Sequence, residues 1–74
     1  MEDLAQQRPL ATLSSRELQV LVLASRGLTN GQMAGELELT VHAVKFHLAA
    51  VYRKLGVANR TEAAVTYLRG TGAP

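Results

Sequence analysis

Positive charges, an aromatic ring and small side chains are combined in residues 41 to 56, VHAVKFHLAAVYRKLG. Read as a helix at about 100° per residue, this stretch has one narrow apolar sector, formed by Val44, Leu48, Val51 and Leu55. The opposite side then carries His42, Lys45, Phe46, Ala49, Ala50 and Arg53. Cations can bind guanine edges and phosphates, and an apolar ring can contact thymine methyl groups. These residue types therefore predict nucleic-acid recognition.

The position of each side chain along this helix divides the predicted contacts into two groups. The N-terminal half of such a helix enters the major groove most deeply. The predicted base contacts are accordingly His42, Lys45, Phe46 and Ala49. Arg53 and Lys54 lie further along and are predicted to reach phosphates. His47 flanks the apolar sector, where it either contacts a phosphate or is a hydrogen-bonded histidine at the edge of the core.

Two of these residues have a simpler alternative. An exposed Phe46 can mark a contact with another protein, because a ring in solvent is unfavourable unless something covers it. Lys45 can be a solvated lysine on a polar face.

The distribution of charge along the chain is stronger evidence for an anionic partner than the net charge of +2. No Asp or Glu occurs from Leu39 to Thr61, and the cations in this window are Lys45, Arg53, Lys54 and Arg60. A one-sided basic patch is typical of proteins that bind nucleic acid. The alternative is a basic face that is merely solvated.

Length and composition exclude several other classes. A chain of 74 residues without cysteine predicts one small domain with no disulfide and no cysteine zinc site. No ligand cluster, phosphate-binding loop or nucleophile–base pair is visible, so we expect no metal, no cofactor and no enzyme activity. An apolar run of about 18 residues is missing, and MEDLAQQRPLATL does not resemble a signal peptide. We therefore expect a cytoplasmic protein without a membrane partner.

Capping signals predict an all-α, compact four-helix domain. Ser14 with Glu17, Thr29 with Gln32, and Asn59 with Glu62 fit capping boxes, while Thr40 is a cap without an acidic or amide partner. Glycines at positions 27, 56 and 70 are predicted to end the first, third and fourth helices. The predicted helices lie near 15–26, 30–37, 41–55 and 60–69. Residues 1–12 are predicted to be a flexible tail or linker, and residues 71–74 a flexible C-terminus.

The second and third predicted helices are joined only by ELT, residues 38–40. We expect Leu39 in this turn to point inward, and the small Ala34 to let the two helices cross closely. Two helices joined by such a short turn are the layout of a helix-turn-helix.

The sequence from Leu13 to about Leu68 closely resembles the LuxR-type (GerE-type) helix-turn-helix domain of bacterial transcription regulators. The most diagnostic segments are SSRELQVL, GLTNGQMA, VKFHL and RKLGVANRTEA. The resemblance implies a DNA-binding domain over residues 13–70, with the helix-turn-helix at about 29–48 and the third helix in the major groove of double-stranded DNA. The predicted phosphate contacts are Thr29, Asn30, Thr40, His47, Arg53, Lys54 and Arg60.

The resemblance also implies that the fourth helix pairs two copies of the domain into a homodimer. The apolar residues of RTEAAVTYL spread over more of this helix than one small core needs, which fits a dimer surface. The predicted interface residues are Ala63, Ala64 and Tyr67, and the alternative is a terminal helix buried in its own domain. RNA polymerase is a further candidate partner.

The sequence departs from the family pattern at three positions of the helix-turn-helix. Gly31 stands where a lysine is usual and Ala43 where a threonine is usual, so two phosphate contacts are lost. Gly35 and Gly31 each weaken the second helix by up to about 1 kcal/mol relative to alanine. These departures predict an affinity for DNA that is lower than is typical of the family, or more dependent on dimerisation. The two lost phosphate contacts also slightly favour an alternative function, in which the fold is a protein-interaction module with weak or no DNA binding.

Overall fold

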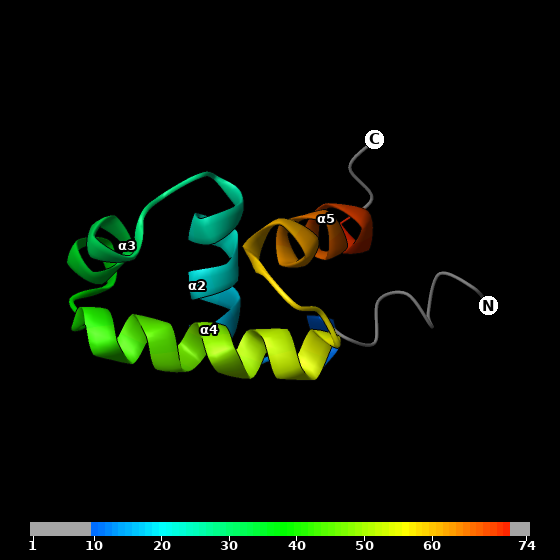
Figure 1. Cartoon of the computed structure of the whole chain (residues 1–74), viewed down its shortest axis with the longest axis horizontal. Helices are drawn as coiled ribbons and strands as arrows, with labels where there is room; N and C mark the ends of the chain where they lie inside the picture. Colours follow the sequence, from blue (N-terminus) through cyan, green and yellow to red (C-terminus); the bar gives the residue numbers. More distant parts are fainter. Residues whose placement is uncertain (1–9, 72–74) are drawn as a thin grey trace.

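The fold consists of helices. A computed structural model describes residues 10–71, which form α2 (Ser15–Ser25), α3 (Asn30–Leu37), α4 (Val41–Leu55) and α5 (Arg60–Gly70) (Figure 1). No strand occurs in this described range. The predicted all-α class is therefore confirmed, and the predicted bounds 30–37 and 41–55 are the observed ones.

The chain before α2 is packed further than expected. Leu10 and Ala11 have a helical backbone, and Leu10 packs with Leu13 against the core around Leu21. The end of the predicted tail at residues 10–12 is therefore corrected, because an apolar side chain there finds a place in the core. Thr71, the first residue of the predicted flexible C-terminus, is hydrogen-bonded to the carbonyl oxygens of Tyr67 and Leu68 at the end of α5. The remaining predicted flexible residues, 1–9 and 72–74, lie outside the described residues.

Side-chain caps begin all of these helices. Each cap oxygen accepts a hydrogen bond from the backbone N–H three residues later, and the caps are Ser14, Thr29, Thr40 and Asn59. The capping box is complete at Ser14 and at Thr29, where Glu17 and Gln32 accept from the cap backbone. At Asn59 the carboxylate of Glu62 instead accepts from the cap side chain. The local sequence thus sets each helix start.

Left-handed backbone ends α2, α3 and α4, whereas α5 continues through Gly70 and ends at its cap, Thr71, with φ −92°, so the predicted stop at Gly70 is corrected. Gly27 and Gly56 have φ values of +90° and +68°, as expected for stops after α2 and α4. The turn between α3 and α4 instead uses Glu38 at φ +55°. A non-glycine residue in this conformation costs roughly 1–2 kcal/mol. The next residue, Leu39, packs against the core as expected and helps to hold the turn.

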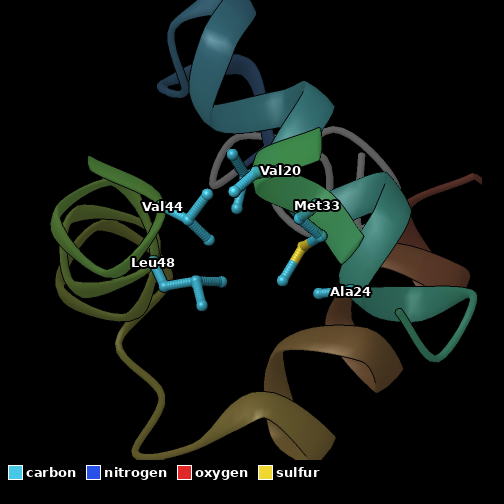
Figure 2. Packing of buried hydrophobic residues seen from close by; sticks show 6 residues of the cluster. Val20, Ala24, Met33, Val44 and Leu48 are labelled. Carbon is cyan, nitrogen blue, oxygen red and sulfur yellow. The ribbon is translucent and has the colours of Figure 1, made fainter. Parts of the chain in front are cut away.

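One core cluster holds the helix-turn-helix together. Met33 of α3 lies between α2 and α4 and has no exposed surface (Figure 2). It packs in one cluster with Val20, Ala24, Ala34, Val44 and Leu48. Ala34 is 7% exposed, which agrees with the prediction that a small residue lets the helices cross closely. Burial of Met33 therefore fixes α3 against both neighbours.

A second cluster joins α2 and α4 to α5. It consists of Leu21, Val51 and Ala63, with partly buried residues such as Leu55 and Tyr67 at its edge. Leu21 is adjacent to Val20, which belongs to the first cluster. The helix α2 therefore contributes to both clusters, and so does α4, through Val44 and Leu48 in the first and Val51 in the second.

Candidate nucleic-acid interface

The predicted base-contacting residues lie together on the outer side of α4. His42, Lys45, Phe46 and Ala49 are all exposed, and so is Arg53, a predicted phosphate contact on the same side. The predicted apolar sector lies on the inner side, with Val44, Leu48 and Val51 buried and Leu55 half-buried. The structure thus keeps the outer face of α4, defined by these five exposed residues, free of packing within the described domain.

Phe46 is the most exposed large apolar residue of the described chain, with 69% of its surface accessible. Its ring meets the His47 ring edge to face, with the ring centroids 5.8 Å apart and an interplanar angle of 78°. The half-buried His47 therefore supports the ring from the flank of α4 without covering it. The exposed ring offers apolar surface beside positive charges, so this surface suits a partner that combines apolar groups with negative charge.

Ala50 does not belong to this outer face, although the helical pattern placed it there. It is only 5% exposed. Ala50 lies one turn before Lys54, whose ammonium binds Glu17 of α2. This flank of α4 is therefore turned toward α2. Ala49 remains as the small exposed residue that lets a partner approach the backbone.

The first turns of α3 and α4 carry no acidic residue, whereas α2 and α5 carry Glu17 and Glu62 there. Thr29 and Thr40 are exposed caps whose hydroxyl oxygens accept from Gln32 N at 3.1 Å and from Ala43 N at 3.0 Å. Each hydroxyl keeps its own hydrogen to donate. A helix N-terminus of this kind favours an anion, because its first N–H groups and the helix dipole point toward it.

Lys54, a predicted phosphate contact, forms an ion pair with Glu17 within the domain. Its ammonium Nζ lies 2.8 Å from Oε1 of Glu17, and the same oxygen accepts the N–H of Ser14 at 2.9 Å. The hydrogen bond from Lys54, followed by that from the Ser14 backbone, holds the pKa of Glu17 below its usual value. The charge of Lys54 is therefore neutralised inside the domain, where it ties the end of α4 to the start of α2.

Replacing Glu17 by glutamine is expected to lower the free energy of unfolding at neutral pH by about 1–2 kcal/mol, because the amide loses the charged hydrogen bond to Lys54. The pKa of Glu17 is lower in the folded state. Its contribution is therefore fully present above the usual value of 4.5 and is lost as the pH falls through the folded-state value.

Urea unfolding of both proteins at about pH 7 and about pH 3 measures this effect, and the wild type should lose more stability between the two. The exposed Glu36→Gln variant is the control for a generic change of charge. Equal losses in the wild type and Glu17→Gln would contradict the assigned role of the pair.

Arg60 and Asn30, both predicted to contact phosphates, bind each other. The guanidinium of Arg60 donates through Nη1 to the carbonyl oxygen of Leu28 at 2.7 Å, and through Nη2 to Oδ1 of Asn30. Both side chains are half-buried. In the acid-free window, Lys45 and Arg53 are then the exposed cations without a hydrogen bond to the described part of the protein. No local sequence pattern predicts these pairings, because they join residues 30 to 37 positions apart.

The predicted dimer residues of α5 differ in their accessibility. Ala63 is only 1% exposed and fills the second core cluster, so its side chain is not available to a partner. Ala64 and Tyr67 are half-buried, and Tyr67 packs against the same cluster. The exposed apolar side chains are instead Val65 at 41% and Leu68 at 45%. Any interface on α5 would therefore centre on these two residues.

Within residues 10–71, no group of His, Asp or Glu side chains is large enough to hold a metal ion. Within the same range, no helix has the length and hydropathy needed to cross a membrane.

Comparison with known proteins supports a regulatory role. Residues 11–67 match the family described as bacterial regulatory proteins, luxR family. The chain is 38% identical over 69 residues to the nitrate/nitrite response regulator protein NarP of Escherichia coli, covering 93% of this chain and 32% of NarP. It is 42% identical over 57 residues to the transcriptional regulatory protein LiaR of Bacillus subtilis, covering 77% of this chain and 27% of LiaR.

A third relative is the HTH-type transcriptional regulator MalT of Yersinia enterocolitica, with 49% identity over 51 residues, 69% of this chain and 6% of MalT. The chain thus spans about a third or less of the length of these relatives.

Proposed function

This chain belongs to the luxR family of bacterial regulatory proteins, and from that membership we propose that it reads double-stranded DNA by sequence to regulate transcription. The observation that carries the proposal is the outer face of α4, where Lys45, Phe46 and Arg53 are exposed on a helix whose other side is buried. An α-helix is about 10–12 Å wide, and the major groove of B-DNA about 12 Å. The outer face therefore suits insertion of α4 into that groove.

The roles of the side chains follow from their chemistry. Lys45 can donate to guanine O6 and N7, and Phe46 offers an apolar contact to a thymine methyl group. His42 lies in the first turn of α4, and Ala49 leaves space for close approach. These four residues are the proposed base contacts.

Phosphate contacts would then flank the groove. Arg53 is exposed in the last turn of α4, and Thr29 and Thr40 cap the acid-free starts of α3 and α4. His47 is a further candidate from the flank of α4. These groups would position α4 on the duplex without reading the bases.

The proposed active form is a homodimer that pairs through α5. Val65 and Leu68 supply the exposed apolar surface, with the half-buried Ala64 and Tyr67 beside them. A two-fold dimer presents two copies of α4 to two half-sites, so the operator should have two-fold symmetry. The place of action would be the bacterial cytoplasm, with RNA polymerase as a further partner.

Selection from a pool of random DNA duplexes, followed by sequencing of the bound fraction at two salt concentrations, tests the proposal. We expect enrichment of a two-fold-symmetric site and an affinity that falls steeply as salt rises. Binding without enrichment would reject sequence reading.

A protein-interaction module is the second candidate, and the exposed Phe46 is the observation that favours it. A partner protein could cover this ring, and Gly31 and Ala43 lack the side chains for two contacts expected in this family. Absence of any DNA binding, together with salt-insensitive binding of a protein through Phe46, would favour this alternative.

A further inference from the structure

A hydrogen-bonded clamp connects the start of α5 to the start of α3. Arg60 is the first residue of α5 and Asn30 the first residue of α3. One nitrogen of the guanidinium binds the side-chain oxygen of Asn30, and the other binds the carbonyl oxygen of Leu28 in the turn before α3. The clamp therefore holds both the turn that leads into α3 and the first residue of that helix.

The helix α3 depends on such anchors more than the other helices do. It has only eight residues and contains Gly31 and Gly35, so its intrinsic stability is low. Its buried residues, Met33 and Ala34, fix the middle of the helix, whereas its first turn is exposed except for the half-buried Asn30. Arg60 therefore adds a hydrogen-bonded anchor at the exposed first turn of α3, between Leu28 and Met33, which both pack against the core.

The clamp also has consequences for the DNA-facing surface. The first turn of α3 contains the Thr29 cap and the backbone N–H groups that are proposed to meet a phosphate. Meanwhile α5 packs against α2 and α4, and it carries the exposed residues of the proposed dimer. Arg60 thus connects α5, which would set the spacing of the two subunits, to the N-terminal end of α3, which would contact the DNA backbone.

We infer that Arg60 is a positioning residue and is not itself a phosphate ligand. Through Asn30 and Leu28, it holds the first turn of α3 in the position from which that turn can bind the phosphate. The inference rests on the proposed DNA-binding function. Arginine suits this role because two separate nitrogens reach two acceptors in fixed directions. The single ammonium of a lysine retains the charge but cannot reproduce this fork.

The first test measures binding to the selected duplex as a function of salt for Arg60→Ala, Arg60→Lys, Asn30→Ala and the double variant Arg60→Ala/Asn30→Ala. Each single variant should weaken binding by about tenfold, because each breaks a charged hydrogen bond. The double variant should be no weaker than Arg60→Ala, since the residues act as one unit. The dependence of affinity on salt should keep the wild-type slope.

Two control variants calibrate these results. Arg69→Ala removes the same charge from the last turn of α5, and should leave binding within about twofold of the wild type if charge alone is not decisive. Arg53→Ala should reduce the salt slope by about 0.9, the change expected on losing one phosphate contact. If Arg60→Lys bound like the wild type while Arg60→Ala reduced the slope like Arg53→Ala, Arg60 would be a phosphate ligand and the inference would be overturned.

The second test needs no DNA. In the free protein, amide hydrogen exchange at Gln32 and Met33, whose N–H groups bind Thr29, should be faster in Arg60→Lys than in the wild type. Exchange at buried positions of α2 and α4 should be unchanged, which distinguishes a local effect from general destabilisation. Unchanged exchange at Gln32 and Met33 would overturn the clamp, whereas failure of the wild type to bind any duplex would reject only the proposed function.

Discussion

Replacing Lys45 by alanine is expected to weaken binding to the selected operator by about 1–3 kcal/mol and to relax the base preference at one position of each half-site. Lys45 is exposed in the N-terminal half of α4, next to the uncovered Phe46 ring. Its removal would leave guanine acceptors without a donor. The fold should be unaffected, because this side chain makes no described contact with the core.

The matched control is Arg53→Ala, which removes the same charge from the last turn of the same helix face. Arg53 is proposed to bind a phosphate, so its loss should weaken specific and non-specific binding alike and flatten the salt dependence. Titration of the operator and of a scrambled duplex with both variants separates the two roles. Unchanged affinity and selectivity in Lys45→Ala would mean that α4 does not read the groove in this way.

Replacing Met33 by alanine is expected to lower the free energy of unfolding by about 2–5 kcal/mol, the range for truncation of a fully buried large side chain. Met33 has no exposed surface and is the main anchor of α3 between α2 and α4 (Figure 2). A small domain has little stability in reserve. We therefore expect a large fraction of this variant to be unfolded, and DNA binding to be lost with the fold.

Urea unfolding followed by circular dichroism measures this loss. The control is Glu36→Ala, three residues later on the exposed side of α3, which should change stability by no more than about 0.5 kcal/mol. A cost below about 1 kcal/mol for Met33→Ala would show that the first cluster can repack around the vacancy.

The fold was largely predictable because its signals are local. Each cap oxygen accepts a hydrogen bond from a backbone N–H only three residues later. Ser14, Thr29 and Thr40 can therefore be recognised as helix caps from a few neighbouring residues. Glycines mark two of the helix ends for the same reason. The left-handed conformation of Glu38 could not be predicted, because nothing in the local sequence favours it in a glutamate; the adjacent Leu39 packs against the core.

The arrangement of the candidate site was predictable only where its residues lie on a single helix. Helical periodicity placed Lys45, Phe46 and Arg53 on the outer face of α4 correctly. It could not show that Lys54 is neutralised by Glu17, because that contact depends on how α2 crosses α4. The burial of Ala63 in the core could not be predicted for the same reason, because either a partner or the core could cover an apolar residue of this helix.

The adjacent residues Val20 and Leu21 of α2 belong to different core clusters. Their side chains diverge by about 100° around the helix, so the direction of one fixes the direction of the other. A single residue inserted between them would rotate the rest of α2 by that angle, and only one cluster could then be filled. The length of this helix is thus constrained more tightly than its composition, and natural variation in chain length should be confined to the turns and the ends.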